Sequence, residues 1–361
     1  MRRFLALCLA VLLCGCGGRE QTTPGVSGAG EESRTTPRAE AAGSIGLVEA
    51  ANCNDIKSVE KAIQAIKHRD DGVARLIQAL RDENHFVQLA AATALSESGS
   101  KAVPDVTHLL SERDDNVRTW AIAILGAIGK PASTAVPLLK TTLDDRQPKI
   151  AELAATALAQ IGGREATDIF VASITHPDKK IRGQALSFLE SAKAKVAVPA
   201  LITALGDKDA DIRRNAAIGL FARYTSPEVA AAVPGLREAL HDSNTEVRWW
   251  SAHALGAFKE KSKAAIPQLI ETLKDKDESV RGQAIEALGN IGPEQGVVQA
   301  LIGMLQDSNP HVRAATAGSL GNLGPAASAA IPALEKLRGG PDEFVTHAVD
   351  DAIAKLSGKR E

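Results

Sequence analysis

The sequence predicts an all-α protein, an α-solenoid or superhelix of about nine to ten helical hairpins. A β-branched residue that opens a helix recurs every 30 to 35 residues between Val87 and Val345. Glycine and proline recur at similar offsets in more than half of the repeats, as expected where helices end and begin. Alternating runs rich in β-branched and aromatic residues, which are typical of strands, are missing, and only 3% of the residues are aromatic.

Residues 1–16 are predicted to be a secretion signal. MRR supplies a basic start, FLALCLAVLL an apolar stretch, and LCGC small residues at a cleavage point. The tetrad that ends at Cys16 resembles a bacterial lipobox, in which the cysteine is lipidated and becomes the first residue of the mature chain. The resemblance implies a lipoprotein of the bacterial cell envelope, with the outer membrane favoured and the folded part outside the cytoplasm. An ordinary cleaved signal is the alternative.

Residues 17–54 are predicted to form a disordered tether. They are rich in Gly, Ser, Thr, Pro and Glu and show no apolar period. Cys8 and Cys14 leave with the signal and Cys16 carries lipid, so Cys53 is the one cysteine left and has no partner for an intramolecular disulfide. The folded solenoid is then expected over residues 55–361.

The first helix of each repeat is predicted from the recurring residue, here called the anchor. Apolar or small residues follow it four and eight positions later, which places them on one helical face. Glycine stops several of these helices twelve positions after the anchor. The anchors are Val87, Val117, Ile150, Ile181, Ile212, Val247, Val280, Val312 and Val345, and the glycines are Gly99, Gly129, Gly162, Gly292 and Gly324.

The second helix of each repeat is predicted to start with proline in its first turn, where the missing N–H costs nothing. These prolines are Pro104, Pro137, Pro199, Pro234, Pro267 and Pro332. Asp, Ser and Asn then form a tight turn before the next anchor. A hairpin of this size cannot bury its apolar face alone, so the hairpins must stack.

This pattern, D-x-x-V-R-x-x-A-x-x-A-L-G-x-I-G with a following A-V-P-x-L-x-x-L-L, resembles the HEAT repeat, in the short variant often called the phycobilisome-lyase HEAT-like repeat. In such stacks the arginine after the anchor pairs with an aspartate of an adjacent repeat. The resemblance therefore implies a structural ladder with modest energy for each exposed pair. Its arginines are Arg118, Arg182, Arg213, Arg248, Arg281 and Arg313. Aspartates precede several anchors by three positions, and the ladder should weaken at Gln88, Ala151 and Thr346.

Two of the three tryptophans lie together in VRWWSAHALGAF, from Val247 to Phe258. With the anchor as position zero, positions 2 and 6 point away from the buried arc. Trp249 and His253 occupy these two positions and are predicted to face outward. Trp250 and Trp120 lie at position 3 and are predicted to pack between helices.

The HEAT resemblance implies that the anchored helices line the concave side of the superhelix. Trp249 and His253 would then share that surface with Arg214 and Ile218 from the preceding repeat and Glu286 from the next, and Gly282 would leave open space beside the ring. Exposed tryptophan beside arginine is typical of protein interfaces. We therefore expect a protein or peptide partner on the concave face. The alternative is a tryptophan folded over a neighbouring helix.

Catalytic and nucleic-acid-binding functions have little support in the sequence. It contains no GxxxxGK[ST], GxSxG, HExxH or CxxC motif, and none of its eight histidines precedes the glutamate that iron-dependent HEAT-like hydroxylases require. The net charge of -2 offers no basic field for phosphates. We expect a lipid-anchored, non-catalytic scaffold without a cofactor. An enzyme or cofactor carrier related to the hydroxylases or bilin lyases, or a purely structural spacer, remains the alternative.

Overall fold

The structure is a computed structural model that describes residues 65–66 and 69–358. The predicted signal with Cys16, the tether, Cys53 and the start of the predicted solenoid lie outside the described residues. The chain divides into two compact units, Met1–Ile169 and Phe170–Glu361. Within the described part, both units consist of α- and 3₁₀-helices joined by turns, and no strand is present. The prediction of stacked helical hairpins is confirmed.

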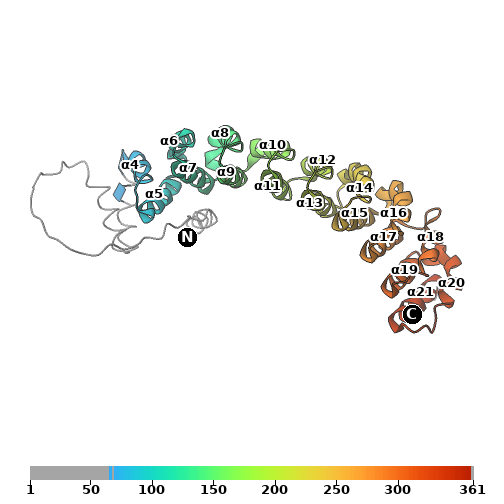
Figure 1. Cartoon of the computed structure of the whole chain (residues 1–361). Coiled ribbons are helices and arrows are strands. Elements are labelled where there is room, and N and C mark those ends of the chain that lie inside the picture. The colour runs from blue at the N-terminus through green and yellow to red at the C-terminus, as the bar shows by residue number, and fades with distance from the viewer. Residues whose placement is uncertain (1–64, 67–68, 359–361) are drawn as a thin grey trace, which may run out of the picture. The chain divides into compact units, whose positions relative to one another are not determined.

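The helices of the first unit form two layers (Figure 1). The anchored helices lie side by side in one layer: α5 (His85–Ser98), α7 (Asp115–Ile128) and α9 (Pro148–Ile161). Each packs against the shorter helices of the other layer: α4 (Gly72–Ala79), α6 (Val103–His108) and α8 (Val136–Thr142). Helix α10 (Gly163–Ser173) crosses the sequence boundary between the units.

The second unit repeats this arrangement (Figure 1). Its anchored helices are α11 (Lys179–Leu189), α13 (Ala210–Phe221), α15 (Thr245–Phe258), α17 (Glu278–Ile291), α19 (Pro310–Asn322) and α21 (Glu343–Leu356). Its other layer contains α12 (Ala194–Ala204), α14 (Val233–Ala239), α16 (Ile266–Thr272), α18 (Val297–Met304) and α20 (Ile331–Glu335). We call the layer of anchored helices the anchored layer.

The hydrophobic core lies between the two layers, where the repeat pattern places it. Every anchor is at most 4% exposed, and the leucines eight positions after eight of the anchors are fully buried. Glycines bring the anchored helices unusually close together. A Cβ on Gly256 of α15 would lie 2.8 Å from the Cα of Ala287 on α17. The core therefore depends on small residues at helix contacts as well as on large apolar ones.

The predicted stop glycines all have positive φ, but Gly99, Gly129, Gly162 and Gly292 do not adopt the left-handed helical conformation. Gly99 has φ 61° and ψ -135°, and Gly129 has φ 72° and ψ -140°. This region strongly favours glycine because it has no Cβ. Lys259 ends α15 in nearly the same conformation, with φ 52° and ψ -127°, and is the one non-glycine with positive φ in the described residues.

Five of the six predicted prolines lie in the first turn of a helix, at the start of α6, α8, α14, α16 and α20. The prediction was wrong for Pro199, which lies inside α12 because that helix begins earlier, at Ala194. In most other repeats the residues before the proline form a 3₁₀-helix, such as Lys259–Ala265 before α16. No helix among the described residues combines the length and apolarity needed to cross a membrane.

Candidate functional site

The turns between repeats are organised by side chains that cap the anchored helices. Asp277 accepts hydrogen bonds from the N–H groups of Ser279 and Val280, and Asn244 does the same for Glu246 and Val247. Asn84, Asp114, Asp178, Asp209 and Asn309 hold equivalent positions. The aspartates three positions before the anchors Val117, Ile181, Ile212 and Val280 are thus helix caps, whereas Asp342, three positions before Val345, makes no cap hydrogen bond.

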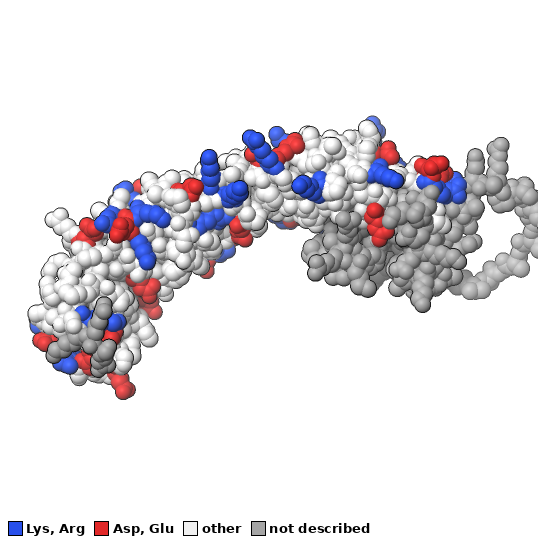
Figure 2. All heavy atoms as spheres, turned by 180° about the vertical axis from the view of Figure 1, so that it is seen from behind, with Lys and Arg blue, Asp and Glu red and all other residues white. Residues whose placement is uncertain are grey.

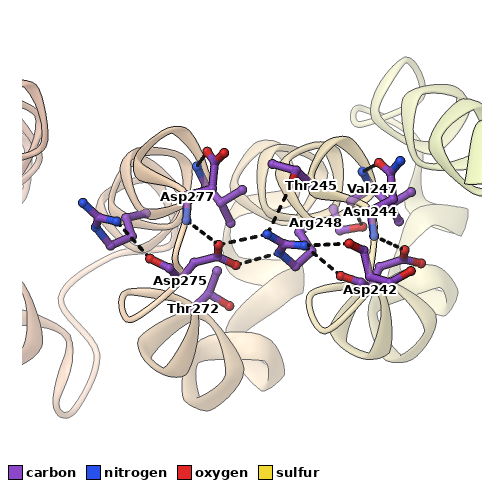
Figure 3. Close-up of polar contacts among 12 residues, drawn as sticks. Asp242, Asn244, Thr245, Val247, Arg248, Thr272, Asp275 and Asp277 are labelled. Atoms are coloured by element: carbon purple, nitrogen blue, oxygen red, sulfur yellow. Dashed lines mark hydrogen bonds and ion pairs between the residues drawn. The ribbon is translucent and has the colours of Figure 1, made fainter.

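Five of the six ladder pairs use a different aspartate, which lies five positions before the next anchor, and the sixth uses Asp342. Arg248 on α15 donates from Nε and Nη2 to the two carboxylate oxygens of Asp275, at 2.7 and 3.0 Å (Figure 3). Its Nη1 donates to the carbonyl oxygen of Asp242, at 2.9 Å. Asp275 lies five positions before the next anchor and also accepts from the N–H of Asp277. One guanidinium thus ties its own turn to that of the following repeat.

All six predicted ladder arginines pair with an aspartate in the turn that leads to the next anchored helix. The pairs are Arg118–Asp145, Arg182–Asp207, Arg213–Asp242, Arg248–Asp275, Arg281–Asp307 and Arg313–Asp342. The expectation that these pairs are exposed was wrong for most of them. In the Arg182–Asp207 pair the side chains are only 3% and 7% exposed. Burying the pairs makes their hydrogen-bond partners indispensable, because an unpaired buried charge is costly.

Burial and pairing act against each other on the ladder aspartates. For Asp275, burial is the largest influence and by itself raises the pKa. The hydrogen bonds from Arg248 and from the N–H of Asp277 outweigh it, so the pKa of this carboxyl is lowered overall. The same balance lowers the pKa of Asp242 and Asp307. These carboxyls are therefore charged at neutral pH, and the ladder is a fixed structural element.

The three departures from the ladder differ in what replaces the arginine. Gln88 donates from Nε2 to the carbonyl oxygen of Asp82 at 2.6 Å and accepts at Oε1 from the indole N–H of Trp120 at 3.1 Å. Ala151 is buried, and the shielded Thr346 hydroxyl makes no hydrogen bond within the described residues. Trp120 is 1% exposed, which confirms that it packs in the interior.

An aromatic cluster lies on the anchored layer of the second unit. It comprises Phe221, Tyr224, Trp249, Trp250 and His253, from the end of α13 and from α15. The ring centroids of Trp249 and His253 stack at 5.0 Å, and those of Trp249 and Trp250 meet edge to face at 4.8 Å. The Phe221 ring lies 4.3 Å from that of His253 and 5.9 Å from that of Trp250.

Both tryptophans of the cluster are half-buried, and their surroundings differ. The Trp250 ring contacts Phe221 across the α13–α15 junction, as its predicted packing position requires. The Trp249 ring contacts that of the next residue, Trp250, and that of His253, which lies one turn further along α15. Trp249 is therefore neither fully exposed nor folded over a neighbouring helix, because its ring packs partly against residues of its own helix. It leaves part of its ring open to solvent.

Arg214 has a different environment from the one expected. Its guanidinium pairs with Glu246 at 2.7 Å and with Asp211 at 3.3 Å, so the arginine is held by carboxylates instead of standing free beside the tryptophan. Ile218, on the same helix, is half-buried. Of these two residues, only the apolar one is free to extend the aromatic surface.

The following helix, α17, supplies the polar side of the cluster. Gln283 shares a hydrogen bond with His253, and the charge of Glu286 acts on the same ring. Burial is the main influence on His253 and lowers its pKa, against the opposing effects of Glu286 and Gln283. A Cβ added at Gly282 would meet nothing within 4 Å, so the open space expected there is present. Trp249, His253 and Glu286 therefore lie on adjoining surfaces of α15 and α17.

The repeat pattern does not single out Phe221 or Tyr224, although both belong to the cluster. They lie nine and twelve positions after the anchor Ile212, where several other repeats have glycine, so both are departures from the pattern. The available signal was compositional, because Phe221, Tyr224, Trp249, Trp250 and Phe258 fall within 38 residues of a chain that is only 3% aromatic.

Charge and metal-ligating groups are dispersed over the described residues. Figure 2 shows a face that is largely uncharged, with Lys and Arg side chains spaced along it and Asp and Glu side chains among them. Within the described residues, no three His, Cys, Asp or Glu side chains gather in a way that could hold a metal ion. Against this dispersed charge, the aromatic cluster gathers five rings in one place.

Comparison with known proteins identifies the repeats. HEAT repeats match residues 73–144, 103–189, 135–222, 218–279 and 266–354, which together span most of the chain. An engineered protein of known crystal structure aligns with 21% identity and a TM-score of 0.48, over 90% of this chain and 97% of its own. No curated protein matches the chain.

Proposed function

Because the chain belongs to the HEAT repeat family, we propose that it is a non-catalytic scaffold that binds a protein or peptide on the anchored layer around Trp249. The observation that carries this proposal is the half-buried aromatic cluster on α13 and α15. Tryptophan and tyrosine that are partly open to solvent are the residues that most often dominate binding energy at protein interfaces.

The low aromatic content of the chain strengthens the case that the cluster has a function. The chain has seven Phe, three Trp and one Tyr, and four of these residues meet in this one place. Tyr224 at its edge is 47% exposed. Large aromatic rings on a surface are costly to leave in water, so their concentration here favours a surface that is covered in the assembled state.

The arginine ladder supports the same choice by elimination. A row of six arginines could mark a site for an anionic ligand, but these guanidinium groups are engaged by aspartates and by turn carbonyls. They hold the repeats together. The aromatic cluster and the neighbouring residues of α17 are partly exposed, so they remain available for a partner.

We extend the proposal to the setting of the protein. The anchored layer is proposed to be the concave face, as the HEAT resemblance implies, and the repeats are proposed to be the short phycobilisome-lyase-like variant. Lipid on Cys16 and the tether over residues 17–54 would hold the scaffold at a bacterial envelope membrane, with the outer membrane favoured. Labelling with a radioactive fatty acid tests this directly: wild-type protein should incorporate label, and Cys16→Ala should not.

A pull-down from solubilised envelope tests the binding function. Wild-type protein should retain a partner that Trp249→Ala loses, whereas Phe344→Ala should retain it. Phe344 is a suitable control because it is 44% exposed on α21 and stacks on His311, outside the cluster. Equal recovery by all three proteins would favour the structural spacer. A tightly bound chromophore on the purified protein would favour the cofactor-carrying alternative.

A further inference from the structure

We propose that the aromatic cluster binds an arginine side chain of an extended partner segment, with Glu286 as the counter-charge. This inference rests on the proposed function and specifies the chemistry of the partner. A planar guanidinium stacks on aromatic rings and bonds to carboxylates, and both kinds of group adjoin here.

The first support is the position of Glu286. It lies on α17 at the position equivalent to His253 on α15, and its charge acts on the His253 ring. The Glu286 side chain is exposed, and no salt bridge engages it within the described residues. An open carboxylate therefore borders the half-buried ring stack of Trp249 and His253.

The cations Arg214 and Lys261 near the cluster are already engaged by other groups. Arg214 is held by Glu246 and Asp211. The Lys261 ammonium donates to the carbonyl oxygens of Tyr224 and Ser226, at 3.4 and 3.2 Å. On the α17 side of the cluster, the charge beside the Trp249–His253 stack is thus the unpaired carboxylate of Glu286. A cationic side chain would complement it, whereas an acidic one would be repelled.

The protonation state of the His253 ring allows a cation to bind beside it. Its ring faces Phe221 from α13, Trp249 and Trp250 on its own helix, and Gln283 and Glu286 from α17. Burial is the main influence on its pKa and lowers it, so the ring is neutral at pH 7. A neutral imidazole extends the aromatic surface without repelling a guanidinium.

The surface beside the cluster leaves room for a peptide backbone. Gly282 on α17 and Gly318 on α19 take the outward positions, and a Cβ on either would meet nothing within 4 Å. Ala314 is the outward residue between them in the repeat pattern. An extended chain can lie over these small residues while its arginine reaches the rings of the preceding helix.

The test uses the full chain labelled with 5-fluorotryptophan and followed by fluorine NMR. Its three tryptophans give three signals, and buried Trp120 in the first unit serves as an internal reference. The probes are Gly-Ser peptides that carry two arginines, two citrullines or two glutamates. Citrulline matches arginine in shape and lacks its charge. The arginine peptide should shift the Trp249 and Trp250 signals and leave that of Trp120 unchanged.

The variants test each half of the site. Glu286→Gln should weaken binding of the arginine peptide about two- to fivefold, in line with an exposed ionic and cation–π contact. Trp249→Ala should weaken it at least about fivefold, with Trp250 as the reporter. Raising the salt concentration should reduce the difference between the arginine and citrulline peptides, because exposed charges are screened.

Equal shifts with the arginine and citrulline peptides, or no shift of either cluster tryptophan with the arginine peptide, would overturn the inference. The outcome is separable from that of the proposed function. If the arginine peptide fails while the envelope partner is still lost by Trp249→Ala, the surface binds a partner of another chemistry and the proposed function stands. If the pull-down is also insensitive to Trp249→Ala, both the arginine inference and the proposed function are contradicted.

Discussion

Arg248 on α15 and Asp275 in the turn before α17 join two repeats through a pair of hydrogen bonds of 2.7 and 3.0 Å. The same guanidinium donates to the carbonyl oxygen of Asp242 in the preceding turn. Because each repeat contacts mainly its neighbours, such a pair acts on the interface energy that makes a solenoid cooperative.

Removing the carboxylate of this pair should be strongly destabilising. Asp275→Ala leaves the guanidinium of Arg248 buried with an unmatched charge, and we expect a loss of about 3–5 kcal/mol in the free energy of unfolding. Denaturant unfolding measures the loss. Hydrogen exchange should locate it at α15 and α17. The control is Asp350→Ala, which removes an exposed pair with Arg338. A loss no larger than that of the control would contradict a buried ladder.

Lys259 occupies a backbone conformation that favours glycine, so Lys259→Gly should stabilise the protein. Relief of the strain at φ 52° is expected to add about 1–2 kcal/mol to the free energy of unfolding. Gly99→Ala is the reciprocal test, because Gly99 has φ 61° and open space around its Cα. It should destabilise by a similar amount. Thermal unfolding of both variants checks the signs, and a less stable Lys259→Gly protein would refute the strain.

Gly256 and Gly282 should respond oppositely to alanine. A Cβ on Gly256 would collide with the backbone of Ala287, so Gly256→Ala should cost about 1–3 kcal/mol through overpacking. Gly282 has free space, so Gly282→Ala should be neutral or should gain up to about 1 kcal/mol from helix propensity. Both changes add one methyl group to an anchored helix. Similar effects in chemical denaturation would mean that the helices do not approach closely at Gly256.

Gln88 and Trp120 form a polar pair in the interior of the first unit. Gln88→Ala removes the acceptor of the Trp120 indole N–H, and an unsatisfied buried donor costs about 1–3 kcal/mol. Trp120→Phe in the same background should recover part of this loss, because phenylalanine has no donor to satisfy. A double-mutant cycle of unfolding free energies measures the coupling. Additive effects would show that the hydrogen bond contributes little.

His253 should make stability depend on pH. Its pKa in the folded protein is lowered, so the unfolded chain binds a proton first as the pH falls. The free energy of unfolding should therefore decrease as the pH drops below about 6.5, until the folded-state pKa is passed. His253→Asn should flatten this part of the profile. Parallel profiles for the two proteins between pH 7 and 5 would contradict the burial of the ring.

Periodicity explains why the fold was predictable. The anchors and the leucines eight positions later are buried because both lie on one helical face, and that face is visible in the sequence. Stop glycines and first-turn prolines follow from backbone sterics and were also predictable. Pro199 was placed wrongly because only the position of the preceding turn shows that α12 begins at Ala194.

The site was less predictable because its contacts cross between repeats. The choice of Asp275 over Asp277 as the partner of Arg248 depends on where the next helix starts relative to α15. Phe221 reaches His253 only because the end of α13 lies beside the middle of α15. Helical periodicity gives the direction of a side chain within one helix, and the neighbour it meets depends on how the helices stack.

Site-specific photo-crosslinking shows which face of the repeats the partner contacts. A photoreactive residue at Gly282, on the anchored layer, is compared with one at Gly303 on α18, and both positions have room for a side chain. We expect an envelope protein to be crosslinked from position 282 and not from position 303, and this product to be lost when Trp249→Ala is added. Equal products from both positions, or a product unaffected by Trp249→Ala, would show that the aromatic surface is not the binding site.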